Sequence, residues 1–311
     1  KNLFTSSFKM LKMKRFLIEV ISAVCLIFMA GFLFYRTNIP SSISKRIQKT
    51  EEKLEIINLG TSHGSNFDYR DCALNGLRIN KAANTVYYDL QNYLYLNNQN
   101  YLSEDALIII PVSYFAFGLD ENRSDRYPNK SFVNEYYYYL PTDQIFSFSM
   151  DKKVRLTILN IQDNFQDLIE SEEVQIKKKK KPINITDSTL NSQAISRVKH
   201  HRKLGEFSSQ KSYRYLETLI EEIISNNHTP ILVATPYHYS YNENFGKDWL
   251  NIHYFSIMKD LSVKYNITYL DYSHDERLVC ETNYFANSDH LNPEGRKVFS
   301  SILFNDLGIH K

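Results

Sequence analysis

From residue 54 to the C-terminus, short apolar runs alternate with longer amphipathic segments, and this alternation limits the possible folds more than any other feature. The apolar runs that have the length of buried strands are Leu54–Leu59, Leu107–Val112, Ile231–Thr235 and Ile267–Asp271. A further short strand is expected near Cys72–Leu74. Buried strands that alternate with helices form a mostly parallel sheet with helices on both of its faces. The predicted fold class is therefore α/β, built as a three-layer α/β/α sandwich.

Three segments have the residue spacing of helices. Apolar side chains recur at helical intervals over Ser212–Ile224 and again from Trp249 to Leu261. The last helix is predicted to begin after Asn292 as its N-cap, with Pro293 at the first helical position, and to stop at Gly308. These helices would supply the outer layers of the sandwich.

Residues 120–207 interrupt this rhythm and are interpreted as an insertion, because they contain no clear strand. The insertion includes the charged run Lys177–Lys181, which is most simply a solvated loop. The alternative is a surface that binds anionic headgroups or an acidic polymer.

Phe16–Tyr35 is a nearly unbroken apolar stretch of 20 residues, the length that a helix needs to cross the hydrocarbon core of a membrane. Its one ionisable residue, Glu19, lies near enough to the end to reach the interface. A signal peptide is the competing interpretation, but the run is long for one and no small-residue cleavage site closes it. An uncleaved transmembrane helix over residues 16–35 is therefore predicted.

Four basic residues within Lys9–Arg15 precede this helix, and by the positive-inside rule they keep residues 1–15 in the cytoplasm. Basic residues that follow the helix lie further from the membrane and weaken the asymmetry. Residues 36–53 then form a polar stalk, and residues 54–311 form one globular domain. The predicted localisation is the cell membrane, with a single span and an extracytoplasmic domain.

Composition argues against several classes of protein. The formal net charge is +2 and no element interleaves basic with aromatic residues, so no nucleic-acid partner is expected. Cys25, Cys72 and Cys280 are too few for a disulfide framework, and none has the spacing of a metal site. No metal or cofactor is predicted. The abundance of Tyr, Asn and Lys is typical of an AT-rich bacterial genome.

A glycine-flanked serine follows the first predicted strand, where Gly60–Gly64 reads Gly-Thr-Ser-His-Gly. In open α/β sheets, ligands bind beyond the carboxyl ends of the strands. Ser62 would lie there on a tight turn near a helix N-terminus, whose amides favour developing negative charge. On its own, Ser62 would be interpreted as an N-cap, and a second motif changes that interpretation.

The second motif precedes the final helix, where Asn287–Gly295 reads Asn-Ser-Asp-His-Leu-Asn-Pro-Glu-Gly. It places His290 at the same rim of the sheet as Ser62, with an adjacent acid and a capped helix to hold the ring. A serine and a histidine at these two junctions predict a nucleophile and its general base. Tyr237 and His238 follow the fourth strand on this rim and are candidates for a substrate-binding wall, with simple loop packing as the alternative.

In these blocks the chain resembles the SGNH (GDSL-like) hydrolase superfamily. It is most similar to the membrane-anchored branch that acts on cell-envelope polymers, like the teichoic-acid D-alanylation protein and the alginate and peptidoglycan O-acetylation proteins. The resemblance runs from Leu54 to the C-terminus apart from the insertion, and it implies a flavodoxin-like sheet. It also implies that Ser62 is the nucleophile and that Gly76, after the second strand, gives an oxyanion-hole amide. The neighbouring His63 and Asn75 are further candidates for substrate binding.

Two positions depart from the family pattern. Ser113 stands where the family has an oxyanion-hole asparagine, and its hydroxyl is the expected donor. Asn287 stands three residues before His290, where the family has the aspartate of its acid-base pair. If Asn287 orients the ring, Asp289 points to solvent or caps the final helix. If Asp289 is the acid, its carboxylate must reach the ring nitrogen that faces away from the serine; the spacing favours Asn287.

The resemblance implies two-step acyl transfer through a Ser-His pair, by an O-acyltransferase or a carboxylic ester hydrolase. Expected partners are a cell-envelope glycan or another acylated polymer, the membrane, and a multi-pass membrane acyltransferase that supplies the acyl group. The alternatives are a catalytically weak or inactive SGNH-fold scaffold of an envelope-modification system, and an unrelated membrane-tethered α/β domain. A serine-reactive fluorophosphonate separates enzyme from scaffold, because only an activated serine reacts.

Overall fold

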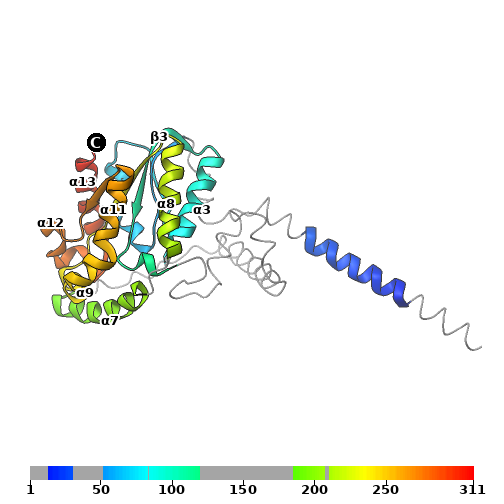
Figure 1. The fold of residues 1–311 in the computed structure, drawn as a ribbon, viewed down its shortest axis with the longest axis horizontal. Helices are drawn as coiled ribbons and strands as arrows, with labels where there is room; N and C mark the ends of the chain where they lie inside the picture. The colour runs from blue at the N-terminus through cyan, green and yellow to red at the C-terminus, as the bar shows by residue number, and fades with distance from the viewer. Residues whose placement is uncertain (1–12, 31–51, 83, 120–184, 207–209) are drawn as a thin grey trace, which may run out of the picture. The chain divides into compact units, whose positions relative to one another are not determined.

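The computed structural model describes residues 13–30, 52–82, 84–119, 185–206 and 210–311 (Figure 1). The chain divides into two compact units, one of Lys1–Ser42 with Pro141–Ile176 and one of Ile43–Leu140 with Lys177–Lys311. The sheet and the candidate site belong to the second unit. The predicted N-terminal segment, stalk and insertion therefore lie partly or largely outside the described residues.

Five parallel strands form one sheet in the order β2-β1-β3-β4-β5, which is the flavodoxin-like order. Their bounds are β1 Leu54–Asn58, β2 Gly76–Arg78, β3 Leu102–Pro111, β4 Thr229–Ala234 and β5 Thr268–Asp271. The four longer predicted strands and the parallel sheet are confirmed. The short strand predicted near Cys72–Leu74 is wrong, because pairing with β1 begins only at Gly76. Cys72 instead forms an isolated antiparallel bridge with His310.

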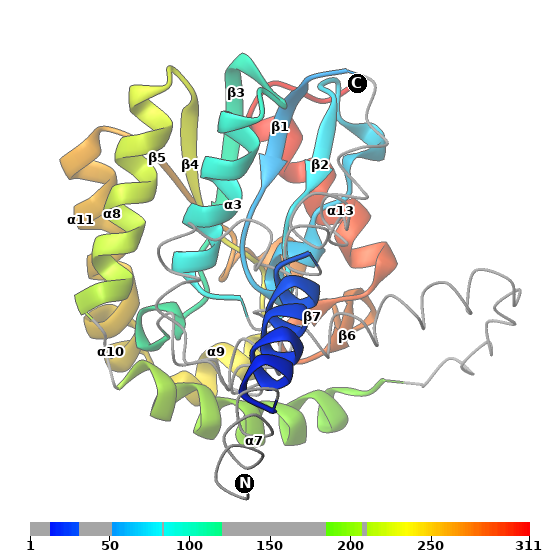
Figure 2. The ribbon, with the colours of Figure 1, turned by 90° about the vertical axis from the view of Figure 1, so that its right-hand side faces the viewer.

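Helices cover both faces of the sheet, so the predicted three layers are present. Figure 2 shows α3 (Val86–Asn98) and α8 (Gln210–Ser225) in front of the strands and α13 (Pro293–Asp306) behind them. The core on the α13 side joins strands to that helix through fully buried residues, among them Ile56, Ile109, Val233, Phe299 and Leu303. Burying one such side chain stabilises the fold by roughly 1.5–3 kcal/mol.

The predicted helices are confirmed, with one irregularity. The segment from Trp249 to Leu261 begins as α10 (Lys247–Leu250), passes through one π-helical stretch, η4 (Asn251–Phe255), and continues as α11 (Ser256–Tyr265). The final helix starts as predicted, because the side chain of Asn292 accepts hydrogen bonds from two amides of its first turn, each at 3.0 Å.

The described end of the insertion is a helix, α7 (Asp187–Gly205), which the sequence analysis did not predict. Its buried side chains recur at helical spacing and include Leu190, Ala194, Val198 and His201. It packs on α9 (Tyr239–Phe245) and on the 3-10 turn η3 (Ala116–Gly118). In Figure 2 it runs below the sheet, across the carboxyl ends of the strands. The run Lys177–Lys181 lies outside the described residues.

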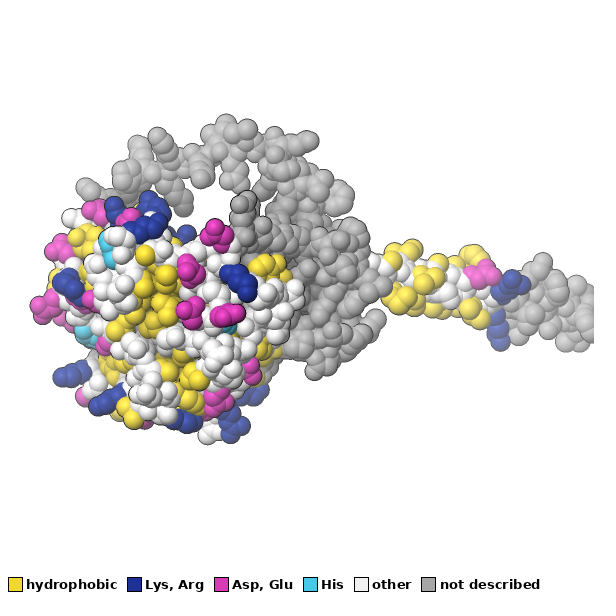
Figure 3. Space-filling model, turned by 90° about the horizontal axis from the view of Figure 1, so that it is seen from above, with side chains coloured by type: hydrophobic (Ala, Val, Ile, Leu, Met, Phe, Trp, Pro, Cys, Tyr) yellow, Lys and Arg dark blue, Asp and Glu magenta, His cyan; other side chains and the backbone are white. Residues whose placement is uncertain are grey.

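Residues 13–30 are helical, and their large apolar side chains are exposed, as in Phe16 at 64% and Ile27 at 71% (Figure 3). Across the described parts of the chain, no helix combines the length and the apolar character needed to cross a membrane. Residues 31–35 of the predicted span lie outside the described residues.

Candidate active site

The loop after β1 is held in place by three hydrogen bonds to the side chains of Asp89 and Asn58. Gly60 adopts a φ of +101°, which favours glycine, and its amide donates to the buried carboxylate of Asp89 on α3 at 2.8 Å. The side-chain amide of Asn58 donates to two carbonyls of the loop, at 3.0 and 2.9 Å. The chain then enters the 3-10 helix η1 (Ser62–Asn66). These contacts fix Ser62 at the carboxyl edge of the sheet.

A small hairpin brings His290 to the same edge. Strands β6 (Phe285–Asn287) and β7 (His290–Leu291) pair antiparallel directly before α13. The Nε2 atom of His290 lies 2.7 Å from the Ser62 hydroxyl oxygen, within hydrogen-bond distance. The structure therefore brings together the two residues that were predicted as nucleophile and base.

The other ring nitrogen of His290 faces two acceptors. Its Nδ1 lies 3.0 Å from Oδ1 of Asn287 and 3.3 Å from Oδ1 of Asp289. This environment assigns the proton of a neutral ring to Nδ1 and leaves Nε2 to accept from the serine. The expectation that Asp289 points to solvent or caps the final helix is wrong, because Asp289 is fully buried and Asn292 provides that cap.

Asp289 is the centre of a buried charge network. Its Oδ2 accepts a hydrogen bond from Nη2 of Arg197 at 2.8 Å and from Nε2 of His63 at 3.3 Å. Burial alone would raise the pKa of Asp289, but the charges of His290 and His63 and their hydrogen bonds hold that pKa well below its usual range. Asp289 is therefore ionised at neutral pH, next to the imidazole of His290.

Sequence reasoning missed Arg197 because residues 120–207 were interpreted as an insertion with no clear strand, and α7 was not recognised within it. The apolar spacing of its buried residues was the available signal for the helix. Nothing in the spacing connects Arg197 with Asp289, which is 92 positions away.

His63 is buried against the pair formed by Ser62 and His290, and a substrate in solvent cannot contact it. It is 1% exposed, and its ring centroid is 4.8 Å from that of His290. Burial lowers the pKa of His63 to about 4, so its ring is neutral at pH 7. With its Nε2 proton directed at Asp289, its Nδ1 accepts from the Ser113 hydroxyl at 2.7 Å. The prediction that His63 binds substrate is wrong.

The same hydrogen bond decides the role of Ser113. Its single hydroxyl proton is donated to His63, and its oxygen accepts from the Thr61 hydroxyl at 3.0 Å. At 1% exposure it cannot turn toward a substrate without breaking both bonds. The prediction of Ser113 as an oxyanion-hole donor is therefore wrong, and Ser113 instead links the nucleophile loop to His63.

Gly76 and Asn75 lie away from the site. Gly76 is the first residue of β2 and is paired with Ile56 in the middle of β1, not with the loop that follows β1. The Asn75 side chain donates to the carbonyl of Lys53, before β1 begins, at 3.0 Å. Both predictions are wrong because β2 starts later in the sequence than expected, which leaves these residues on the amino side of the strand.

Asn80 contacts the loop after β1 from the carboxyl end of β2. It follows β2, and its Nδ2 donates to the Thr61 carbonyl at 3.3 Å. A side chain on Gly64 would overlap Asn80, so this approach depends on glycine there. The Asn80 side chain therefore holds the loop that carries Ser62 from the β2 side. In the sequence, Asn80 could have been identified only as a polar residue that follows β2, and this requires the correct bounds of β2.

Tyr237 and His238 are both completely buried. The Tyr237 ring packs edge-on against His63, with centroids 5.1 Å apart. The Nδ1 atom of His238 lies 2.8 Å from the Ser240 hydroxyl. Neither side chain forms a substrate wall, so the packing alternative is correct and the substrate-binding prediction is wrong.

Within the described part of the chain, one group of side chains has metal-ligand character, namely His63, Asp289 and His290, whose donor atoms lie within 4.8 Å of one another. The group does not fit a cation. Arg197 already neutralises the carboxylate, His63 directs its Nε2 proton at it, and Nδ1 of His290 is engaged with Asn287. This arrangement of side chains can support proton transfer and ring orientation.

Comparison with known proteins finds only solved structures of low sequence identity. No protein-family model matches the chain, and no curated protein is significantly similar to it. Among solved structures, it is similar to a GDSL-like lipase from Bacteroides thetaiotaomicron, with 9% identity, a TM-score of 0.41, and coverage of 85% of this chain and 94% of that one. An acetyl xylan esterase from Geobacillus stearothermophilus gives 10% identity, a TM-score of 0.37, and coverage of 84% and 97%.

Proposed function

We propose that the protein is a serine-dependent esterase or O-acyltransferase of the SGNH type. The observation that carries this proposal is the 2.7 Å contact between the Ser62 hydroxyl and Nε2 of His290, on a ring whose other nitrogen faces Asn287 and the buried carboxylate of Asp289. A hydroxyl, a base and an orienting acid in line are the parts that an activated nucleophile needs.

The geometry supports a two-step reaction. His290 removes the Ser62 proton through Nε2 while the oxygen attacks an ester carbonyl, and Asp289 stabilises the imidazolium that forms. The backbone amide of Ser62 and the second N–H of the Asn80 side chain are the proposed donors to the resulting oxyanion. His290 then returns the proton to the departing alcohol, leaving an acyl group on Ser62. Water completes hydrolysis, or a sugar hydroxyl completes transfer, by the same steps in reverse.

The proposed substrate is an O-acyl group on a cell-envelope polysaccharide, reached from a membrane anchor at residues 16–35. The exposed apolar helix at residues 13–30 and the basic residues before it support the anchor. A multi-pass membrane acyltransferase is the proposed acyl donor for a transferase. Extraction of membranes with alkaline carbonate tests the anchor: the protein should stay with the lipid, and release into the supernatant would refute the anchor.

Labelling with a fluorophosphonate tests the proposed chemistry. The reagent should form one adduct, at Ser62, and the adduct should be absent from the Ser62→Ala and His290→Ala variants. Ser65→Ala is the matched control, since Ser65 lies in the same 3-10 helix and is also half-buried. Intact-protein mass spectrometry gives the readout. A folded protein that takes no label would instead favour the non-enzymatic scaffold, which the Asn287 departure also fits.

A further inference from the structure

Asp289 lies between two pairs of serine and histidine. One pair is Ser62 with His290 and the other is Ser113 with His63, and each hydroxyl oxygen lies 2.7 Å from a ring nitrogen of its histidine. The second ring nitrogen of each histidine lies 3.3 Å from a carboxylate oxygen of Asp289. Ser62 is half-buried, whereas Ser113 is 1% exposed. Only the first pair can therefore react with a substrate, and the second pair can act only within the protein.

The hydrogen bonds of the second pair have one direction. Ionised Asp289 can only accept, so His63 donates to it through Nε2 and accepts through Nδ1. The Ser113 hydroxyl then donates to His63 and accepts from the Thr61 hydroxyl at 3.0 Å. We call Thr61, Ser113 and His63 the buried chain, since none of them is more than 5% exposed. Thr61 directly precedes Ser62, so the buried chain joins the nucleophile loop to the acid.

Several donors share the charge of Asp289. Its Oδ2 accepts from Arg197 at 2.8 Å and from His63 at 3.3 Å, and its Oδ1 faces Nδ1 of His290, which Asn287 also contacts at 3.0 Å. A hydrogen bond to a carboxylate stabilises its charge and lowers its affinity for a proton, so each donor reduces what the carboxylate offers to the others. His63 therefore limits how strongly Asp289 stabilises a proton on His290.

Further ionisable groups near Asp289 are neutral near pH 7. Burial lowers the pKa of His201 to about 3, although the charge of Asp289 raises it. Burial also raises the pKa values of Tyr237 and Tyr241 above the usual value for tyrosine, and the charge of Asp289 adds to this rise. These three groups do not change charge near neutrality, so they do not mask a change made at His63.

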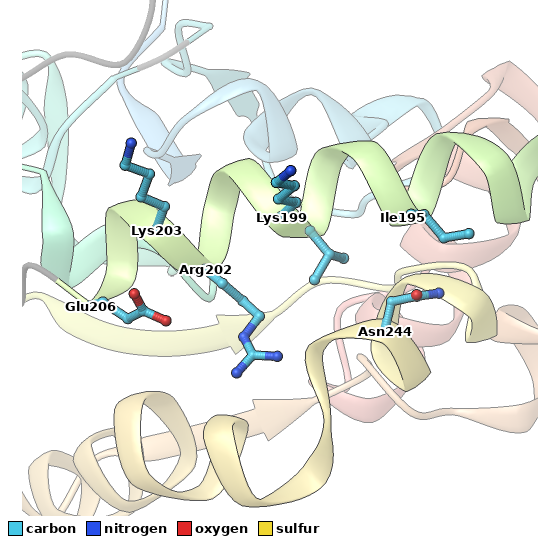
Figure 4. A pocket seen from close by; sticks show the side chains of 7 residues that line it. Ile195, Lys199, Arg202, Lys203, Glu206 and Asn244 are labelled. Atoms are coloured by element: carbon cyan, nitrogen blue, oxygen red, sulfur yellow. The ribbon is translucent and has the colours of Figure 1, made fainter.

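Arg197 is the cation that α7 directs at Asp289. Further along α7, Lys199, Arg202 and Lys203 line a separate hollow of about 570 Å³ between α7 and α9. In that hollow the two lysines point to one side of the helix and Arg202 points to the other (Figure 4). Arg197 thus keeps Asp289 ionised, and His63 adds a neutral donor to the same carboxylate oxygen.

We propose that His63, held by Ser113 and Thr61, is a positioning residue that limits the stabilisation of protonated His290 by Asp289. The proposal rests on the proposed function, in which His290 must be unprotonated to accept the proton of Ser62. Without the hydrogen bond from His63, Asp289 would hold a proton on His290 more firmly. His290 would then become protonated, and inactive as a base, at a higher pH.

Titration of the His290 ring tests this inference without any turnover. The full chain, with isotope-labelled histidine rings, would be followed by NMR as the pH changes, and His290→Ala identifies the signal of His290. His63→Phe removes the donor but keeps a ring against Phe115 and Tyr237, and the midpoint of the His290 titration should rise by roughly 0.5 to 1 pH unit, the size expected for one lost hydrogen bond. Ser113→Ala removes the bond that fixes the His63 ring and should raise the midpoint by less. If His63→Phe does not fold, Ser113→Ala provides the test alone.

Two further variants show whether the donor itself is responsible. His63→Gln can still donate to Asp289 through its side-chain amide, so its midpoint should match that of the wild type. Ser240→Ala is the matched control, because Ser240 is also 1% exposed and lies 2.8 Å from Nδ1 of a buried histidine, His238. It should leave the midpoint unchanged. An unchanged midpoint in both His63→Phe and Ser113→Ala would overturn the inference, as would an equal rise in His63→Gln or in Ser240→Ala.

Activity gives a second and separate readout. The acidic limb of kcat/KM for p-nitrophenyl acetate, plotted against pH, should move to higher pH in His63→Phe together with the NMR midpoint, and His63→Gln should restore it. A purely structural role of His63 would lower the rate at all pH values and leave the limb in place, which would also overturn the inference. If Ser62 takes no fluorophosphonate while the midpoint moves as expected, the proposed function fails and the effect of His63 on Asp289 stands.

Discussion

Replacing Ser62 by alanine should lower kcat for an activated ester by about 10⁵-fold, and His290→Ala should cost a similar factor. The reason is that the two residues act as one unit across the 2.7 Å contact between Oγ and Nε2. The double variant should therefore be no slower than either single variant. Stopped-assay kinetics with p-nitrophenyl acetate measure the effect, and circular dichroism checks that the fold is kept.

Ser65→Ala is the control for this prediction and should keep nearly full activity. If Ser62→Ala, folded as the wild type, kept more than about a tenth of the rate, it would rule out acyl transfer through this residue, because uncatalysed attack by water cannot supply such a rate.

Asp289→Asn should lower kcat by about 10³-fold with little change in KM, because it removes the negative charge next to the imidazolium. The carboxylate lies 3.3 Å from Nδ1 of His290, and its pKa is held low, so it carries charge throughout the working range. Asn287→Asp is the comparison: it adds a second carboxylate beside the first, and the rate should stay within about tenfold of the wild type. The opposite ranking, with Asn287→Asp much faster and Asp289→Asn silent, would assign the acid's role to position 287.

The effect of Asp289→Asn on the free energy of unfolding should depend on pH. At neutral pH, Asp289→Asn leaves Arg197 and His63 without their anionic partner and should cost about 2 kcal/mol of unfolding free energy. Because the folded-state pKa of Asp289 is depressed, its contribution is complete above the pKa of an unfolded aspartate and is lost as the pH falls toward the folded value. Urea unfolding at a series of pH values should therefore show the two proteins converge in acid. A constant gap at all pH values would mean that the charge of Asp289 does not stabilise the fold.

The sequence predicted correctly those elements whose signals lie within a few neighbouring residues. A long apolar run identifies β3, and the cap at Asn292 identifies the start of α13, because both depend on residues within one element. The positions of Ser62 and His290 followed from the rule that parallel strands end on one edge, and the hairpin before α13 brings them together.

The failures have a common cause, which is dependence on tertiary placement. β2 has only three residues, all half-buried, so periodicity cannot locate it, and the misplacement carried Gly76 and Asn75 with it. His63 follows the nucleophile directly, yet its side chain points inward to Asp289 and Ser113. Sequence spacing says where a residue lies along the chain, but not which face of a loop it occupies.

The docking of α7 against α10 has a practical consequence. The chain has one tryptophan, and it lies where α7 ends: a side chain built on Gly205 would come within 2.6 Å of the Trp249 ring. Trp249 is 8% exposed. Separation of α7 from α10 would expose the indole to water and shift its emission to longer wavelength. The fluorescence of Trp249 therefore reports whether α7, the helix that brings Arg197 to Asp289, is in place, and it can be followed without any added dye.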